Sequence, residues 1–549
     1  MRFFCLLTVL ALLIGGCTPS SPPFDLVVRN GLVYDGSGGE PYRADIGVRG
    51  DSIAAIGPDL GRAIRSIDAT GMAVAPGFIN MLSWANESLL VDGRAQSDLR
   101  QGVTLEVMGE GRSMGPLNAR MKQEMTENQQ ALRYEVSWTT LGEYLKHLED
   151  RGVAVNVASF VGNGTLRTHV IGYADRAATP EEMQEMKDLL ARSMEEGAVG
   201  LSSSLLYSPS MHADTEELTE LARVAGRYGG MYISHIRNEG DELFEAVDEL
   251  ISICRDADVR SEIYHLKASG EANWWKMDSV IRLIDRVRAQ GLPVTADMYT
   301  YNASSTGLHV QLPEWVRKEG IDAMLKELED PAVRERVIGE LTFRNPPDRI
   351  LFVGFKNPDL RQYNGRRLDE VAAELGLPPG EAVVDLIVRD QSRIQVVYFS
   401  MSEENIDRKI QQPWMSFCSD AGAYSAEGVF LEQSTHPRAY GSFIRVLGQF
   451  SRDKGLFPLE EGIRRLTSLP AENLRLERRG HLKVGHYADI VVFDPAEVRD
   501  NATFADPHQY ATGVRDVLVN GCLSLENGTP TGNPCGRFVK GPGARAAMP

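Results

Sequence analysis

The stretches GGMYISHIRNEG (229–240) and RSEIYHLKASG (260–270) decide the fold, because each holds a short apolar run that ends in a histidine. A short apolar run bounded by turn residues is typical of a buried strand. His235 and His265 therefore stand at equivalent ends of two strands. In a barrel of alternating strands and helices, such ends meet at the face that carries the chemistry. The pattern predicts two imidazoles on that face.

Six further apolar runs repeat this texture, and helical patterns lie between many of the runs. A helix is expected over 180–197, where Thr179 supplies an N-cap and acidic residues fill the first turn. Eight strands that alternate with helices predict an α/β fold, a TIM-like (β/α)8 barrel. The six further runs are GFINML (77–82), GVTLEVM (102–108), VAVNVASFV (153–161), GAVGLSSS (197–204), LPVTADMY (292–299) and WMSFCSD (414–420).

Both ends of the remaining chain have a different texture. Short strand-like runs rich in Val, Ile and turn glycines fill 25–75, and the same texture returns in 475–540. We expect one small β-sandwich domain built from both segments, with the barrel over 76–474. A long gap separates the seventh and eighth barrel strands. It predicts an insertion at about 309–410, which we interpret as a lid over the barrel mouth.

The first 17 residues, MRFFCLLTVLALLIGGC, predict an export signal, since one Arg precedes an apolar run too short to span a bilayer. LIGGC resembles a bacterial lipobox, in which Cys17 is lipidated; an ordinary signal peptide cut nearby is the alternative. With 18–24 as a linker, we expect a membrane-tethered lipoprotein of the bacterial cell envelope, on its periplasmic side or outer surface. The net charge of −18 argues against a nucleic-acid partner, because phosphates need a basic surplus.

Export affects how the cysteines are interpreted. Cys522 and Cys535 flank the turn-rich stretch LSLENGTPTGNP, and in an oxidising compartment they could form a disulfide. Free thiols at both positions are the alternative. Cys254 and Cys418 lie in apolar surroundings and are expected to be buried thiols.

Potential metal ligands or bases stand where four of the expected strands end. Glu110 follows the second strand and Asp420 the eighth, while His235 and His265 end the fifth and sixth. Two imidazoles and one carboxylate are a familiar zinc set that leaves a position for water. Asp420 could take that water's proton and pass it to a leaving amine. An aspartate in SDAG would equally suit a cap of the following turn.

A series of motifs runs in order from about residue 25 to 540: LVVRNGLVYDGSG, PGFIN, RQGVT, GTLR, GLSSSLLYSP, SHIRNEG, HLKASG, DMYTYNASST, SDAG, HPRAYGSFIRVLG and GHLKVGHYADIVVFDP. On these motifs the chain resembles the D-aminoacylase (N-acyl-D-amino-acid deacylase) family of the amidohydrolase superfamily. The resemblance implies the amidohydrolase barrel with its β domain, a zinc site, and hydrolysis of N-acyl-D-amino acids.

The same resemblance implies residue roles. His235 and His265 match the family's zinc-binding histidines, and Asp420 matches its catalytic aspartate. The family's substrate-binding positions fall on five residues of this chain, and fold support at the barrel mouth is the alternative role for them: Lys267, Tyr301, Ser304, Ser305 and Arg438. Lys267 matches a lysine thought to hold the substrate carboxylate, and an arginine suits a carboxylate by bidentate geometry.

The chain departs from the family pattern at its metal site. Leu82 and Trp84 stand where the family has a His-x-His pair, and neither side chain can ligate zinc. Glu110 takes the place of a cysteine ligand on the second strand, with Glu106, inside that strand, as a competing carboxylate. Asn163 in the GTLR segment stands where a histidine is common.

We therefore predict a mononuclear zinc amidase, with one zinc per chain held by Glu110, His235 and His265 and with Asp420 as base and acid. Its substrate is expected to be a small N-acyl amino acid or a D-residue peptide. Two alternatives stay open: a D-residue dipeptidase or cyclic-amide hydrolase on the same scaffold, and a non-catalytic, membrane-tethered binding protein.

Overall fold

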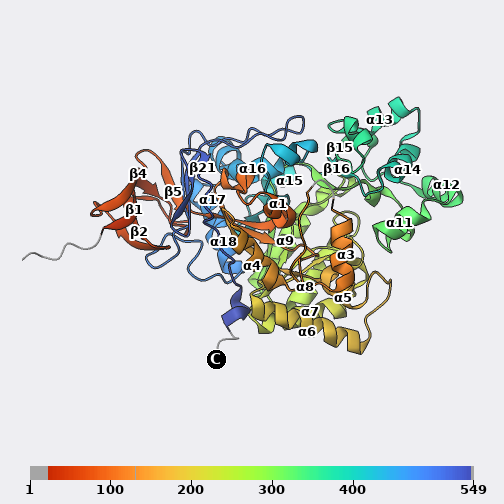
Figure 1. The fold of residues 1–549 in the computed structure, drawn as a ribbon, viewed down its shortest axis with the longest axis horizontal. Helices are drawn as coiled ribbons and strands as arrows, with labels where there is room; N and C mark the ends of the chain where they lie inside the picture. Colours follow the sequence, from red (N-terminus) through yellow and green to blue (C-terminus); the bar gives the residue numbers. More distant parts are fainter. Residues whose placement is uncertain (1–22, 130–131, 546–549) are drawn as a thin grey trace, which may run out of the picture.

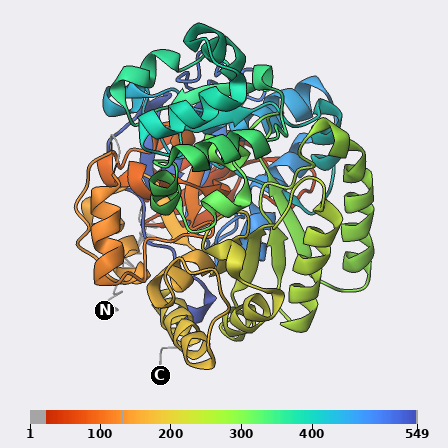
Figure 2. The same cartoon turned by 90° about the vertical axis from the view of Figure 1, so that its right-hand side faces the viewer.

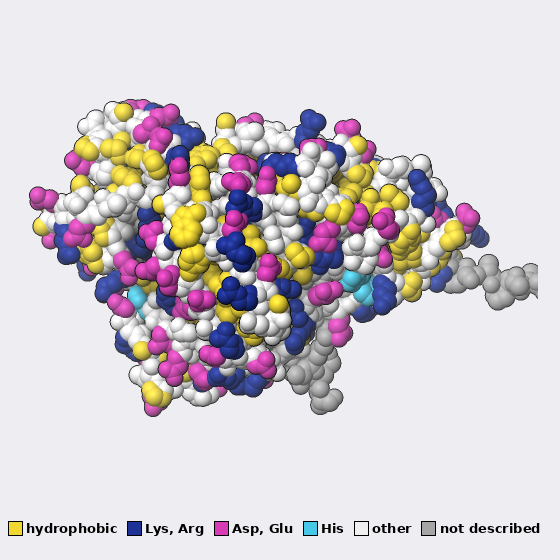
Figure 3. Space-filling view, turned by 180° about the vertical axis from the view of Figure 1, so that it is seen from behind, with side chains coloured by type: hydrophobic (Ala, Val, Ile, Leu, Met, Phe, Trp, Pro, Cys, Tyr) yellow, Lys and Arg dark blue, Asp and Glu magenta, His cyan; other side chains and the backbone are white. Residues whose placement is uncertain are grey.

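The computed structural model describes residues 23–129 and 132–545. The predicted signal segment 1–17 with its lipidation site Cys17, and most of the linker 18–24, lie outside the described residues. Within the described residues, no helix is both long and apolar enough to cross a membrane. Figure 3 shows acidic and basic side chains interspersed over the rear face of the molecule.

The centre of the molecule is a closed barrel of eight strand positions. Parallel pairing runs from β6 through β8 and from β9 through β17, and a bridge between Ser83 and Ala421 closes the ring. The predicted (β/α)8 fold is confirmed. The barrel strands are β6 (Phe78–Ser83), β7 (Val103–Met108), β8 (Asn156–Ser159) with β9 (Val161–Gly162), β10 (Gly200–Ser204), β11 (Met231–His235), β12 (Ser261–Ile263), β13 (Val294–Met298) and β17 (Met415–Phe417).

Helices surround the barrel. α6 begins as its sequence predicts: Thr179 forms a reciprocal capping box with Glu182, and Pro180 occupies the first turn. The surrounding helices are α1 (Ala85–Val91), α2 (Gln96–Leu99), α3 (Ala119–Glu127), α4 (Leu141–Arg151), α5 (Asn163–Val170), α6 (Pro180–Glu196), α7 (Thr215–Arg227), α8 (Leu243–Asp256), α9 (Met277–Ala289), α15 (Glu403–Lys409), α16 (Arg438–Arg445), α17 (Leu459–Leu466) and α18 (Ser468–Asn473).

An N-terminal and a C-terminal segment of the described chain meet in one sheet (Figure 1), in which β5 pairs with β1 on one side and with β18 on the other. This single, continuous nine-stranded sheet encloses an apolar core of its own. Its strands are β1 (Phe24–Val33), β2 (Tyr42–Arg49), β3 (Ser52–Gly57), β4 (Ala63–Asp68), β5 (Ala73–Pro76), β18 (Ile490–Phe493), β19 (Val514–Val519), β20 (Cys522–Glu526) and β21 (Thr529–Pro530).

The chain between β13 and β17 forms a unit with its own apolar core. It lies at the opposite end of the molecule from the nine-stranded sheet, and in Figure 2 it faces the viewer. Its three-stranded antiparallel sheet has the order β14–β16–β15. The elements are β14 (Ser304–Gly307), α10 (Glu314–Arg317), α11 (Ile321–Glu327), α12 (Pro331–Glu340), β15 (Ile350–Gly354), α13 (Leu368–Leu375), α14 (Pro379–Asp390) and β16 (Gln395–Tyr398).

Candidate metal centre and active site

Three buried side chains converge where β7, β11 and β12 end. Oε1 of Glu110 lies 2.9 Å from Nδ1 of His235 and 3.2 Å from Nε2 of His265. Possible ligand atoms of the three residues all lie within 4.8 Å of one another. The strands thus bring together the carboxylate and the two imidazoles that the sequence placed at separate strand ends.

Tight backbone geometry holds these side chains in place. Glu110 stands before Gly111, whose φ is +60° and where an added Cβ would lie 2.2 Å from the Cβ of Ser204, so this turn requires glycine. His265 itself has φ +33°, a conformation that L-residues rarely adopt. Its backbone N–H donates to Oδ1 of Asp297 at 2.7 Å, which ties the residue to the neighbouring strand β13. Such strain is typical of functional positions.

The donor set fits a zinc ion. Zinc prefers imidazole nitrogen and carboxylate oxygen in a group of three, with a further position for water. Nε2 of His235 is buried and has no hydrogen-bond partner among the described residues. Nδ1 of His265 lies 3.1 Å from Oε1 of Glu239, so a proton on Nδ1 can be donated to that carboxylate. The opposite nitrogen, on the Glu110 side, is then free to ligate a metal.

Glu239 is a residue that the sequence reasoning missed. It lies four positions after His235 in the SHIRNEG motif, and this spacing after a strand end was the available signal. Its Oε1 lies 2.5 Å from Nζ of Lys267, which in turn lies 2.6 Å from Nδ1 of His265. Burial by itself raises the pKa of Glu239, but the charges of Lys267 and the two histidines outweigh burial and hold this pKa well below its usual value. Glu239 is therefore an anion that orients His265.

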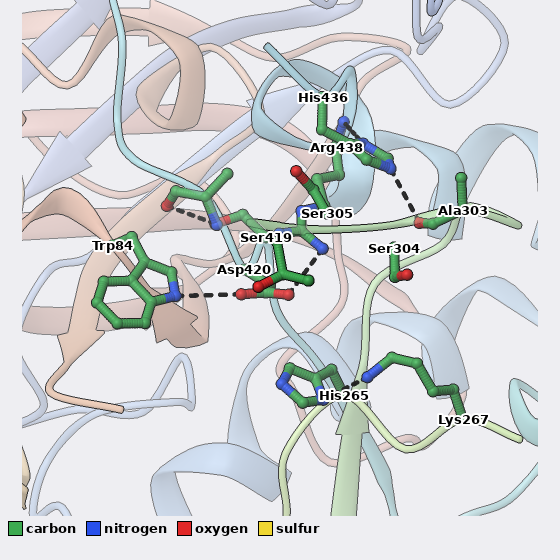
Figure 4. Close-up of polar contacts among 12 residues, drawn as sticks. Trp84, His265, Lys267, Ala303, Ser304, Ser305, Ser419, Asp420, His436 and Arg438 are labelled. Atoms are coloured by element: carbon green, nitrogen blue, oxygen red, sulfur yellow. Dashed lines mark hydrogen bonds and ion pairs between the residues drawn. The ribbon is translucent and has the colours of Figure 1, made fainter. Parts of the chain in front are cut away.

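Asp420 is held from two sides beside this group, as Figure 4 shows. Oδ2 lies 2.7 Å from Nη1 of Arg438, and Oδ1 accepts from the indole N–H of Trp84 at 3.1 Å. Its φ of +48° is again in the left-handed region. Burial raises the pKa of Asp420, and the charge of Arg438 opposes that rise. A carboxylate with a raised pKa beside a metal site is suited to general base and acid catalysis.

A cavity of about 780 Å³ opens above these residues. Glu110, His235, His265, Asp420 and Arg438 all line it, and Ser305 of β14 contributes from the unit between β13 and β17. Nε of Arg438 is buried without a hydrogen-bond partner in the described part of the chain. Arg438 and Ser305 thus stand where a substrate would contact them.

Three of the predicted substrate contacts have other partners. Tyr301 is buried outside the cavity lining, and its hydroxyl donates to Oδ2 of Asp500 at 2.7 Å. Ser304 also lies outside the lining, with its hydroxyl 3.2 Å from that of Ser400. Lys267 is buried against Glu239 and His265. The resemblance assigned these three residues to the substrate, and that assignment stays a prediction.

Glu106, Leu82 and Asn163 contact other residues rather than the metal group or the cavity. Glu106, the competing carboxylate, lies inside β7 and accepts from Nδ2 of Asn80 at 2.9 Å, apart from the two histidines. Leu82 is fully buried in an apolar cluster. Asn163 donates to Oε1 of Glu217 at 3.0 Å. None of these three lines the cavity.

Arg112 and Arg393 are among the arginines of the cavity wall that were not anticipated from the sequence. Arg112 follows Glu110 closely, and Arg393 lies in the loop just before β16. Both are exposed to solvent, and neither forms an ion pair within the described residues. Nη2 of Arg112 donates to the carbonyl of Ser208, and Nη2 of Arg393 donates to Oε1 of Gln395, each at 3.1 Å. The cavity thus holds positive charge without a carboxylate partner.

Away from the site, Cys522 and Cys535 form a disulfide that joins the start of β20 to the segment after β21. Cys254 and Cys418 are buried thiols, as expected.

Sequence comparison relates this chain to known proteins. The amidohydrolase family model matches residues 434–523. D-aminoacylase of Alcaligenes xylosoxydans xylosoxydans is 36% identical over 94% of this chain and 98% of the relative.

Solved structures agree with the sequence comparison. The N-acyl-D-glutamate deacylase of Bordetella bronchiseptica, complexed with zinc and a phosphonate mimic of the tetrahedral intermediate, matches with a TM-score of 0.79 at 31% identity. A D-aminoacylase described for its binuclear metal centre, with one-metal activation and second-metal attenuation, matches with a TM-score of 0.79 at 34% identity. Each match covers 94% of this chain and 100% of the other.

Proposed function

Because the chain belongs to the D-aminoacylase family of amidohydrolases, we propose that it hydrolyses the amide bond of N-acyl-D-amino acids, giving a carboxylate and a D-amino acid. The observation that carries the proposal is the group of Glu110, His235 and His265, with Asp420 beside it at the floor of one cavity. A degenerate binding protein would have no need to place these four side chains together.

The three-donor group would hold one zinc ion. When bound, zinc would polarise the amide carbonyl and lower the pKa of water. Oε1 of Glu239 lies 3.1 Å from Nδ1 of His265 and holds the ring in its orientation. The charge of Lys267 balances that of Glu239. Glu110 is then the carboxylate of the metal group whose negative charge is left for zinc.

Asp420 moves the proton. As a carboxylate it takes a proton from the attacking water, and it then delivers that proton to the nitrogen of the leaving amine. Arg438 holds Oδ2 of Asp420, and its unpartnered Nε remains available to a polar group of the substrate. A zinc ion held by Glu110, His235 and His265 would supply electrophilic stabilisation of the developing negative charge.

An N-acyl amino acid is an anion, and the cavity offers Arg112 and Arg393 to receive it. A guanidinium without a carboxylate partner is well suited to bidentate contact with a substrate carboxylate. Lys267, to which the family resemblance assigns this contact, lies 2.5 Å from Oε1 of Glu239. We therefore assign the electrostatic attraction of substrate to the two arginines.

A panel of N-acyl D- and L-amino acids, with detection of the released amine, tests the function. We expect turnover of D-substrates and little turnover of their L-enantiomers. D-residue dipeptides and cyclic amides belong in the same panel, since preferred turnover of either would assign the site to that chemistry. Release of no amine from any member by zinc-loaded protein would contradict the proposal.

Attachment to the bacterial envelope is a separate proposal. It rests on the sequence of residues 1–17, in which Cys17 follows Gly-Gly. Labelled fatty acid should be incorporated into the full-length protein and not into the Cys17→Ala variant. Equal labelling of the two proteins, or release of unlabelled protein from the cells, would refute lipidation.

A further inference from the structure

The indole N–H of Trp84 lies between two carboxylates of the active site. Nε1 lies 3.0 Å from Oε2 of Glu110 and 3.1 Å from Oδ1 of Asp420. The other oxygen of each carboxylate has a different partner, His235 for Glu110 and Arg438 for Asp420. One neutral donor therefore connects the metal group to the proposed base.

The backbone fixes the position of this indole. Trp84 N–H donates to the carbonyl of Ala421, and Asp420 N–H donates to the carbonyl of Leu82, both at 2.9 Å. These bonds continue the bridge between Ser83 and Ala421 that closes the barrel. The segments that carry Trp84 and Asp420 are thus locked together by main-chain bonds. The ring retains 39% exposure, because it forms part of the cavity wall.

We propose that Trp84 is a positioning residue that holds Glu110 and Asp420 together and fills the place between them in which a second cation would bind. This inference rests on the proposed function, since it concerns the same site. Two neighbouring carboxylates attract a cation, and here a hydrogen-bond donor satisfies them instead. An indole has no lone pair to offer a metal, so the position excludes a second ion.

The described residues support a site built for one metal. They contain no second group of three His, Cys, Asp or Glu donors as close as Glu110, His235 and His265. In the D-aminoacylase with the binuclear centre, the second metal attenuates activity. Trp84 would make this chain insensitive to excess metal by occupying the second position permanently.

Zinc binding without substrate tests the exclusion. The metal-free protein is titrated with zinc, and bound metal is measured after gel filtration. Native protein should bind about one zinc ion per chain, and this number should not rise in excess metal. Trp84→His offers an imidazole at the same place and should bind about two zinc ions per chain. Binding of two zinc ions by the native protein would overturn the exclusion. So would a Trp84→His variant that still binds only one.

Steady-state kinetics test the positioning. Trp84→Phe keeps an aromatic ring but removes the N–H, and we expect kcat to fall by about tenfold to a hundredfold with little change in KM. Trp275→Phe is the matched control, because Trp275 is 65% exposed and lies outside the cavity lining. Near-native kcat in Trp84→Phe would refute the positioning role.

The two measurements separate this inference from the proposed function. Zinc stoichiometry needs no substrate, so it remains informative if no N-acyl-D-amino acid is turned over. Thermal unfolding of each variant identifies any loss of fold, and in that case the zinc titration of the native protein decides.

Discussion

At the scale of single residues, Trp84 replaces a metal-binding histidine of the family with a hydrogen-bond donor. Trp84 cannot ligate zinc, yet its N–H hydrogen-bonds the two carboxylates on which the site depends. Asp420 and His265 adopt left-handed backbone conformations that aim their side chains at the same place. Function at this scale therefore depends on where individual donors and acceptors point. Two predictions belong here.

Asp420→Asn should retain about one zinc and lose activity by roughly a hundredfold to ten-thousandfold, because the amide cannot accept and return a proton. Metal analysis and the rate of amine release measure the two effects. Asp407→Asn, at a surface ion pair with Lys454, is the control and should behave as native protein. Substantial activity in Asp420→Asn would assign the proton transfer to another group.

Arg393→Gln should raise KM for N-acyl-D-amino acids by roughly tenfold and leave kcat nearly unchanged, since it removes a charge that binds substrate before the chemical step. Arg389→Gln on α14, whose native partner is Asp385, serves as the matched control. A native KM in Arg393→Gln would place the substrate carboxylate elsewhere.

At the scale of elements, the barrel strands bring ligands together and the neighbouring segments complete the cavity. β7, β11 and β12 deliver the metal group, while β14 supplies Ser305 and the loop just before β16 supplies Arg393. The disulfide has a comparable role in the nine-stranded sheet, where it secures the chain beyond β21 to β20. One prediction tests it.

Replacing Cys522 and Cys535 together with Ala should lower the free energy of unfolding by about 2–3 kcal/mol, because the cross-link closes a short loop and restricts the unfolded chain. Denaturant unfolding measures the change, and native protein in reducing agent should approach the double variant. If reduction leaves the native unfolding midpoint where it is, the bond does not contribute this stability.

At the scale of the whole molecule, stability carries a pH dependence that arises apart from the metal group. Asp98 and Glu106 are fully buried near each other, and Asn80 donates to both. Burial raises the pKa of Glu106 to about 7, and burial together with the charge of Glu106 raises the pKa of Asp98 well above its usual value. The folded state therefore favours the protonated pair.

Since these folded-state pKa values exceed the unfolded ones, the pair stabilises the fold most below pH 4, and this contribution is lost as pH rises through about 7. Glu106→Gln should remove part of this dependence and be more stable than native protein at pH 8 by on the order of 2 kcal/mol. Unfolding free energies measured at pH 5 and pH 8 check this. A native-like pH slope in Glu106→Gln would show that other groups cause it.

The order of apolar runs and helical patterns was sufficient to predict the barrel, because period and strand length are local properties of the chain. Strand ends also indicated Glu110, His235, His265 and Asp420 as candidates, since parallel strands bring equivalent positions to one face. The sequence further determined that Leu82 and Trp84 cannot ligate zinc.

Only the tertiary structure decided what each side chain contacts. It placed Tyr301 against Asp500 and Lys267 against Glu239, and it brought Arg393 into the cavity from a distant segment. It also showed that the indole N–H of Trp84 is a donor shared by two carboxylates. The physical reason is that a hydrogen bond depends on distance and direction, and both are fixed by packing between segments that are far apart in the chain.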